Sequence, residues 1–328
     1  MRSARLEMAL QDGALVLPPE GRIAVYRPQA GDDLGALPQD RVVVLTGFLP
    51  DHEALKARGH AVDPAPPYAA AMVCLPRSRD HARALLAQAA AEVVPGGPVV
   101  VDGQKHDGID SAIKDLRARV ALGPALSKAH GKLAVFPAGP GLEDWAAQPR
   151  TVEGGFVTRP GVFSADGPDR GSALLAAALP AKLGPKVVDL GAGWGYLSHA
   201  VLSREGVKRL DVVEAEADAL ACARENLPDP RARFHWADAT TFRPESLVET
   251  VVCNPPFHTT RAADPGLGAA FIAAARRMLA PDGALWLVAN RHLPYDAALK
   301  EHFLMVEDIG GDAAFRLIRA AAPKRPAR

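Results

Sequence analysis

The sequence predicts an α/β protein in which short parallel strands alternate with helices. Two observations support this fold class. Short apolar runs end in glycine, acid or asparagine loops and are followed by alanine-rich helical stretches, which is the order of a doubly wound sheet. The same pattern occurs in both halves of the 328-residue chain, which predicts two domains. With 48% hydrophobic residues, each half can form its own core.

The clearest apolar run is the strand predicted over residues 186–190. It ends in a glycine-rich loop that contains Gly191 and Gly193, and a helix is predicted over residues 196–204. Glycine allows a tight turn and a close approach of the backbone to a ligand at the carboxyl end of a strand. A dinucleotide-binding domain begins in the same way, but its loop reads Gly-x-Gly-x-x-Gly and this one reads Gly-x-Gly-x-Gly. The loop therefore favours S-adenosylmethionine over a nicotinamide cofactor.

Two acidic residues extend this cofactor pattern. Glu214 ends the next apolar strand, where an acid can bind the two hydroxyls of a ribose in either cofactor class. Asp238 follows the strand-like segment 232–236, where a third loop would meet an adenine. The residues expected to bind the cofactor are Asp189, Gly191, Gly193, Glu214 and Asp238.

The tetrapeptide Asn254-Pro255-Pro256-Phe257 closes another apolar strand and suggests methylation of a planar nitrogen. An exocyclic amino group is a poor nucleophile because its lone pair is delocalised into the ring. The side-chain oxygen of Asn254 and the carbonyl of Pro255 can each accept one of its N–H bonds and turn the lone pair toward a methyl donor. The prolines restrict the backbone that presents this carbonyl. Phe257 offers an apolar face on which a base can stack.

In this order, the motifs between residues 161 and 320 resemble the class I S-adenosylmethionine-dependent methyltransferases. More narrowly, GVFSADGPDRGSALL at 161–175, NPPFH at 254–258 and VANRHLPY at 288–295 resemble the ribosomal RNA guanine-N2 methyltransferases of the RsmC and RlmG type. The resemblance implies a seven-stranded sheet that ends in an antiparallel hairpin of segments 285–290 and 315–320. It also implies guanine N2 of ribosomal RNA, with 16S RNA of the small subunit as the expected target, and rRNA methylation as the process.

Three further residues are expected near the substrate. The resemblance places Phe163 and Asp166 in a loop over the cleft, and His258, next to Phe257, could contact a phosphate, aid proton release or hydrogen bond to its own loop. Trp194 is a departure, since a bulky residue stands inside the glycine loop, where it either packs against neighbouring elements or narrows the cofactor site.

Other functions remain open at this point. Asn-Pro-Pro-aromatic also serves methyltransferases that act on adenine N6 or on the glutamine amide of a release factor. A non-catalytic rRNA-binding assembly factor could keep the fold without turnover, although the intact set of polar and glycine residues argues against it. A nicotinamide-dependent dehydrogenase would need hydride-handling residues that the sequence does not offer.

The first half reads as a degenerate, shortened copy of the second. AMVCLPRS echoes VVCNPPF, and the strand at 42–45 echoes the strand at 186–190, but Leu75 stands where Asn254 does. We therefore expect a non-catalytic methyltransferase-like domain over residues 1–140, a linker over 141–155 that Trp145 pins to one domain, and the catalytic domain over 156–328. The first domain recognises RNA or supports the catalytic half, with Arg77, Arg79 and Lys105 near its former active-site rim.

Charge and cysteine usage limit the partners. The chain carries 38 basic and 38 acidic residues, so contacts with RNA phosphates must come from local clusters. Cys74, Cys222 and Cys253 have no metal-ligand or disulfide spacing, so no metal is expected and a reducing cytoplasm is the simplest compartment. No segment is apolar enough for a membrane span. The sequence gives no firm oligomeric state, and a monomer is the working expectation.

Overall fold

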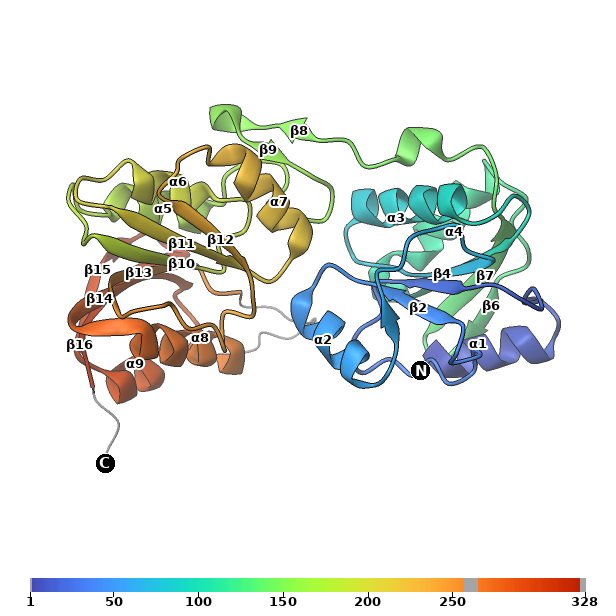
Figure 1. The fold of residues 1–328 in the computed structure, drawn as a ribbon, viewed down its shortest axis with the longest axis horizontal. Coiled ribbons are helices and arrows are strands. Elements are labelled where there is room, and N and C mark those ends of the chain that lie inside the picture. The colour runs from blue at the N-terminus through green and yellow to red at the C-terminus, as the bar shows by residue number, and fades with distance from the viewer. Residues whose placement is uncertain (1, 257–264, 325–328) are drawn as a thin grey trace. The chain divides into compact units, whose positions relative to one another are not determined.

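The computed structural model describes residues 2–256 and 265–324 of the chain. The chain divides into two compact units, Met1–Pro149 and Arg150–Arg328 (Figure 1). The division falls within the stretch 141–155, and Trp145 is buried in the core of the first unit. No helix in the described part of the chain combines the length and the apolar character needed to cross a bilayer.

The first unit contains a seven-stranded mixed sheet. Its strands lie in the order β3-β2-β1-β4-β5-β7-β6, and the last two, β7 and β6, are antiparallel to their neighbours. The strands are β1 (Ile23–Tyr26), β2 (Val42–Leu45), β3 (Ala61–Val62), β4 (Ala70–Cys74), β5 (Pro98–Gln104), β6 (Leu126–Lys128) and β7 (Gly131–Pro137).

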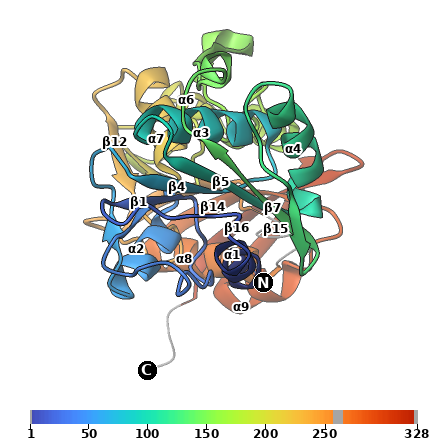
Figure 2. The same cartoon turned by 90° about the vertical axis from the view of Figure 1, so that its right-hand side faces the viewer.

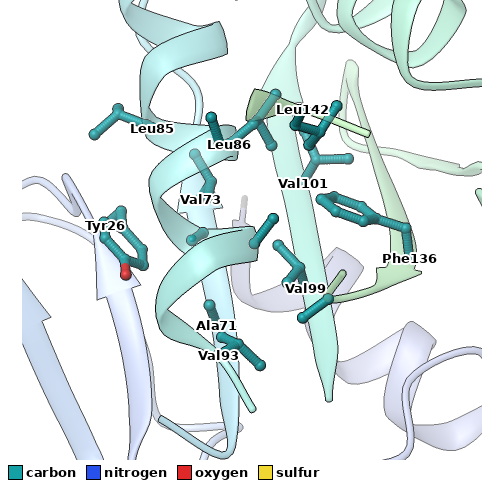
Figure 3. Close-up of a cluster of buried hydrophobic side chains, with 14 of the residues drawn as sticks. Tyr26, Ala71, Val73, Leu85, Leu86, Val93, Val99, Val101, Phe136 and Leu142 are labelled. Carbon is teal, nitrogen blue, oxygen red and sulfur yellow. The ribbon is translucent and has the colours of Figure 1, made fainter. Parts of the chain in front are cut away.

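Helices cover both faces of this sheet (Figure 2). They are α1 (Arg2–Gln11), α2 (Leu49–Ala57), α3 (Arg79–Glu92), α4 (Ile109–Arg117) and the 3-10 turns η1 (Lys105–Asp107) and η2 (Glu143–Trp145). Helices α3 and α4 bury their apolar faces against one side of the sheet, in the cluster that Figure 3 shows around Leu86, Val101 and Phe136. Leu6 and Ala9 of α1 pack against the other side. A sheet covered on both faces explains why its strands read as continuous apolar runs.

The second unit repeats this architecture. Its sheet has the order β12-β11-β10-β13-β14-β16-β15, with only β16 and β15 antiparallel to their neighbours. Its strands are β10 (Lys186–Leu190), β11 (Arg209–Glu214), β12 (Ala232–Trp236), β13 (Val248–Cys253), β14 (Leu279–Asn290), β15 (Phe303–Gly311) and β16 (Phe315–Pro323). A small antiparallel pair, β8 (Arg150–Thr151) and β9 (Val157–Thr158), precedes them with the turn η3 (Glu153–Gly155) between.

Five helices flank the second sheet in the described residues (Figure 1). They are α5 (Arg170–Ala178), α6 (Tyr196–Leu202), α7 (Ala217–Asn226), α8 (Pro265–Met278) and α9 (Asp296–His302). Helices α5, α6 and α7 pack on one face and α8 and α9 on the other, each group with its own buried apolar cluster. The arrangement is the class I methyltransferase fold, so the predicted fold class is confirmed for both units.

The sheet order corrects the strand equivalence proposed from the sequence. Strand β2 (residues 42–45) is the second strand of its unit and corresponds to β11, whereas β1 corresponds to β10. The two valine-rich strands β2 and β10 have nearly the same composition, so the residues alone could not tell them apart. The predicted correspondence between β4 and β13 is confirmed, since both strands lie fourth in the same sheet order. The first unit is shorter partly because residues 27–41, between β1 and β2, form no helix where the second unit has α6.

One strand of the predicted final hairpin was wrong. Segments 285–290 and 315–320 do pair antiparallel, in β14 and β16, but the hairpin joins β15 to β16. Strand β15 was not predicted, because it is the edge strand of the sheet and most of its side chains are half-buried or exposed. The helix expected over 196–204 ends two residues earlier, at Leu202.

Candidate active site

A pocket opens at the carboxyl ends of β10 and β13, where ligands bind in open α/β sheets. It is lined by the loop before α5 and the first turn of that helix, by the glycine loop after β10 and the first turn of α6, and by the residue that follows β13. Its lining residues are Phe163, Ser164, Asp169, Ser172, Gly191, Ala192, Gly193, Trp194, Tyr196, Leu197 and Asn254. The structure thus brings together two motifs that lie about sixty residues apart in the sequence.

The glycine loop requires its glycines. Gly191, Gly193 and Gly195 have φ values of +77°, +57° and +94°, a region that side chains with a Cβ rarely adopt. A Cβ on Gly191 would also lie 3.0 Å from Cε1 of Phe271. The loop therefore presents bare backbone to the pocket.

Asp189 lies under this loop and is fully buried. Its Oδ2 accepts a hydrogen bond of 2.7 Å from the hydroxyl of Ser198 on α6. Its Oδ1 is buried and has no hydrogen-bond partner among the described residues. Burial raises the pKa of Asp189 to about 7, and the neighbouring Glu214 charge adds to this, while the Ser198 hydrogen bond opposes it. An orphaned buried oxygen beside a bare backbone loop fits a site that a polar ligand completes.

Glu214 stands at the end of β11 and faces the same loop. Its Oε2 accepts from the backbone N–H of Gly193 at 2.8 Å, and its Oε1 accepts from the N–H of Glu216 at 2.8 Å. Burial raises its pKa, although these backbone hydrogen bonds act against the rise. A carboxylate has about four acceptor positions, so Glu214 keeps capacity for ligand hydroxyls.

Asp238 lies after β12, and its Oδ1 accepts from both the backbone N–H and the hydroxyl of Thr240, each at 2.7 Å. It does not line the pocket described above. The structure places it on the loop of the third strand, next to the strand that ends in Glu214.

Asn254 follows the last residue of β13 and is held from the side of α5. Its Nδ2 donates to Oδ2 of Asp169 and to the hydroxyl of Ser172, both at 2.9 Å. Both amide hydrogens are thereby used, and the carbonyl oxygen Oδ1 is the atom of this amide left for a ligand. Pro255 is buried and Pro256 is exposed. Phe257 and His258, which were also expected in the site, lie outside the described residues.

Of the two roles considered for Trp194, the structure favours packing against neighbouring elements, although the residue also lines the pocket. It is almost fully buried against Phe156, Tyr196 and Cys222, and its indole N–H donates to the carbonyls of Phe163 and Ser164 at 3.0 and 3.3 Å. The bulky residue in the glycine loop therefore fastens the preceding loop above the pocket.

The two other predicted loop residues differ in placement. Phe163 lines the pocket and is 55% exposed. Asp166 does not line it and pairs instead with Arg150 at 3.2 Å. Asp169 is the N-cap of α5, and its Oδ2 accepts from the N–H of Ser172 at 2.8 Å.

Sequence reasoning missed Asp169 and Ser198. A signal for Asp169 was available, because an Asp directly before an apolar helical run is a typical N-cap. Its contact with Asn254 had no such signal, since the two residues are 85 positions apart.

The three basic residues expected near one rim of the first unit are not gathered in one pocket. Arg77 and Arg79 line a pocket with Trp145, and Arg79 pairs with Asp115 at 2.8 Å. Lys105 lines a different, more open hollow beside the turn between β6 and β7.

The comparisons with known proteins agree with this site. The methyltransferase small domain family matches residues 153–319. The ribosomal RNA small subunit methyltransferase C of Alcanivorax borkumensis is 34% identical over 282 residues, which cover 82% of this chain and 86% of that protein. The ribosomal RNA large subunit methyltransferase G of Streptomyces avermitilis is 32% identical over 258 residues, 72% of this chain and 68% of that protein.

A solved structure covers both units. The T. thermophilus 16S rRNA N2 methyltransferase RsmC, in complex with AdoMet and guanosine, is 25% identical. It matches with a TM-score of 0.79 over 98% of this chain and 91% of that one.

Proposed function

The chain belongs to the RsmC and RlmG type of ribosomal RNA methyltransferases, within the methyltransferase small domain family, and from that membership we propose its reaction. It transfers a methyl group from S-adenosylmethionine to the exocyclic N2 of a guanine in 16S ribosomal RNA. The small-subunit target rests on the 34% identical relative and on the related structure, whose names both specify the small subunit or its 16S RNA.

One observation carries the proposal: the amide of Asn254 offers an oxygen, not a nitrogen, at the end of β13. Its two N–H bonds are taken by Asp169 and Ser172 at 2.9 Å, so Oδ1 is left to accept. An amino group such as guanine N2 is the donor that such an oxygen requires. The carbonyl of Pro255 accepts the second N–H, and Phe257 provides the stacking surface.

The chain's own residues fit the cofactor. Gly191 and Gly193 carry no side chain, so the cofactor can come close to the backbone of this loop. Glu214 would hold the ribose hydroxyls. The orphaned Oδ1 of Asp189 gains a polar neighbour in the loaded site. Asp238 lies on the loop that meets the adenine. When bound, S-adenosylmethionine supplies a methyl group on a positively charged sulfur, an electrophile that needs no further activation.

Orientation is therefore the main task of this chain. Guanine N2 forms the new bond to the methyl carbon, the carbon–sulfur bond breaks with its electron pair on sulfur, and one N2 proton then leaves to solvent. Asn254 and Pro255 hold N2 so that its lone pair faces the methyl group, an alignment that supplies most of the rate. Since N2 is shielded in a duplex, the guanine is single-stranded or flipped out, at a cost of a few kcal/mol.

The first unit is non-catalytic in this proposal, and we place it at residues 1–140 with a linker over 141–155. Its sheet register puts Tyr26 opposite Val73, as Asp189 lies opposite Val252. Tyr26 is buried, and its hydroxyl donates to Glu92 at 2.6 Å. Leu75, the counterpart of Asn254, is buried in the same apolar cluster. Apolar packing thus fills the region that holds polar ligand-binding groups in the second unit.

The proposal is tested by transfer of labelled methyl groups to small subunits, large subunits, their naked RNAs and a release factor, followed by nucleoside analysis. We expect N2-methylguanosine in small-subunit RNA alone. Label in N6-methyladenosine or in the release factor would replace the substrate, and no transfer to any acceptor despite cofactor binding would favour a non-catalytic assembly factor.

The Asn254→Ala variant tests the amide. We expect kcat to fall about 10²–10³-fold, as for loss of one preorganised hydrogen-bonding group. The affinity for S-adenosylmethionine, measured by calorimetry, should stay near that of the wild type. Full turnover in this variant would refute the role of Asn254.

A further inference from the structure

The start of α5 controls which end of the Asn254 amide faces the pocket. Oδ2 of Asp169 accepts from Nδ2 of Asn254 at 2.9 Å while it caps the N–H of Ser172 at 2.8 Å. The hydroxyl of Ser172 accepts from the same Nδ2 at 2.9 Å. The three side chains line one pocket, and Ser172 is only 7% exposed.

This network allows one orientation of the amide. If the Asn254 amide turned by 180°, Oδ1 would face the carboxylate of Asp169, acceptor against acceptor, and the contact with Asp169 would become repulsive. A hydrogen bond between an amide and a carboxylate is also about twice as strong as one between neutral groups. The amide therefore stays with its oxygen toward the ligand.

We propose that Asp169 and Ser172 are positioning residues for the methyl transfer, an inference that rests on the proposed function. They hold Asn254 so that the site accepts a base edge with an amino group and rejects an edge with an oxygen at the same place. Specificity for an amine is thus set by residues that do not themselves contact the base.

The charge of Asp169 has a second consequence. It polarises the Asn254 amide through the shared hydrogen bond, which makes Oδ1 a stronger acceptor. Positive charge grows on guanine N2 as its lone pair is used in the new bond. A carboxylate behind the amide stabilises this charge more than it stabilises the neutral bound base, so Asp169 acts on kcat more than on KM.

Three single variants test the network. Asp169→Ala removes the acceptor and the charge, and we expect kcat to fall about 10²-fold, the size of effect that misplacement of a reacting group produces. Asp169→Asn keeps one oxygen that can cap α5 and face Asn254 but removes the charge, so we expect a fall of about tenfold. Ser172→Ala should lower kcat about threefold to tenfold. In all three, KM for RNA and the affinity for S-adenosylmethionine should change less than kcat.

A matched control separates this role from helix capping. Asn is as good an N-cap as Asp, so Asp169→Asn should leave thermal stability near the wild-type value. Ser203→Ala removes a hydroxyl that donates to the carbonyl of Ala200 outside the pocket, and it should leave kcat unchanged. A loss of kcat in Asp169→Asn without loss of stability supports positioning; wild-type kcat in Asp169→Ala overturns it.

An exchange of the two groups gives the sharpest test. Asn254→Asp alone places two carboxyl groups together, which must share a proton or repel, and we expect almost no turnover. The double variant Asp169→Asn/Asn254→Asp restores an amide–carboxylate pair with the acceptor facing the base. We expect it to recover at least about tenfold in kcat over Asn254→Asp, because contacting partners are strongly non-additive. Additive losses would overturn the inference.

A readout without turnover distinguishes failure of this inference from failure of the proposed function. The side-chain amide protons of Asn254, observed by NMR in the full-length chain, should shift and exchange faster in Asp169→Ala but less in Asp169→Asn. If the wild type methylates no guanine, the proposed function fails whatever these signals show. If it methylates guanine and the signals are the same in all variants, the inference fails alone.

Discussion

Among single residues, the buried carboxyl group of Asp189 gives the second unit a pH dependence. Its pKa is raised to about 7, mainly by burial, from a normal value of 3.8. The folded chain therefore binds a proton that the unfolded chain has already released between about pH 4 and pH 7. Stability falls as pH rises through this window and levels off above it. The raised pKa of Glu214, also due mainly to burial, acts in the same direction.

Asp189→Asn should flatten this dependence. The amide keeps an acceptor for Ser198 and carries no charge, so the free energy of unfolding of the variant should change less from pH 5 to pH 8. At about 1.4 kcal/mol per pKa unit, the wild type loses a few kcal/mol over the window. Denaturant unfolding at four pH values, without cofactor, measures both proteins. Parallel curves for the two would contradict the role assigned to Asp189.

Among the elements, α1 is fastened to the first sheet by a buried ion pair. Arg5 on α1 donates to both carboxylate oxygens of Asp102 on β5, at 2.6 and 2.9 Å, and both side chains are fully buried. Arg2 adds a further contact to the same carboxylate. Arg5 also donates to the carbonyl of Lys128, the last residue of β6. One guanidinium thus joins a helix, the strand β5 and an edge strand.

Arg5→Met should destabilise the first unit by about 3–5 kcal/mol, because it leaves Asp102 buried with only part of its partners. The double variant Arg5→Met/Asp102→Leu should lose less, since the buried carboxylate is removed and Arg2 keeps its pair with Asp32 at 3.2 Å. Chemical denaturation of the full-length chain measures both. A double variant that is less stable than Arg5→Met would show that the pair itself, and not the orphaned charge, determines the loss.

For the whole molecule, the two units share one strand order, but among the described residues the glycine-rich loop proposed for the cofactor occurs in the second unit alone. The loop of residues 27–41 after β1 lacks the Gly-x-Gly-x-Gly pattern, and the buried Tyr26 takes the place of Asp189. Tyr26 and Leu75, which stand at the positions of Asp189 and Asn254, are buried in the apolar cluster of the first unit.

The full-length chain should therefore bind one molecule of S-adenosylmethionine. Isothermal titration should give a stoichiometry near one, and Gly191→Val should abolish binding, because it forces a branched side chain into a φ of +77° and against Phe271. Two binding events per chain, or one that survives in Gly191→Val, would show that the first unit also binds the cofactor.

Much of the site was predictable because its signals are local. The glycines of the loop, Glu214 at a strand end and the Asn-Pro-Pro sequence are each read from the backbone conformation or the chemistry that their own positions require. Strands 186–190 and 232–236 were predicted with the bounds that the structure has, because periodicity and end signals suffice there. The edge strand β15, which is only partly buried, lacked such a signal.

The sequence by itself therefore determined the fold class, the repeat and the chemical types at the strand ends, since short-range patterns encode them. Only the tertiary structure decided which strands correspond between the units, because hydrogen-bond pairing between β1, β2 and β4 sets their order. It also decided that Asp169 meets Asn254 across 85 residues and accepts a hydrogen bond from its amide nitrogen. That contact depends on how α5 packs against β14 and β16, a long-range relation that no local pattern records.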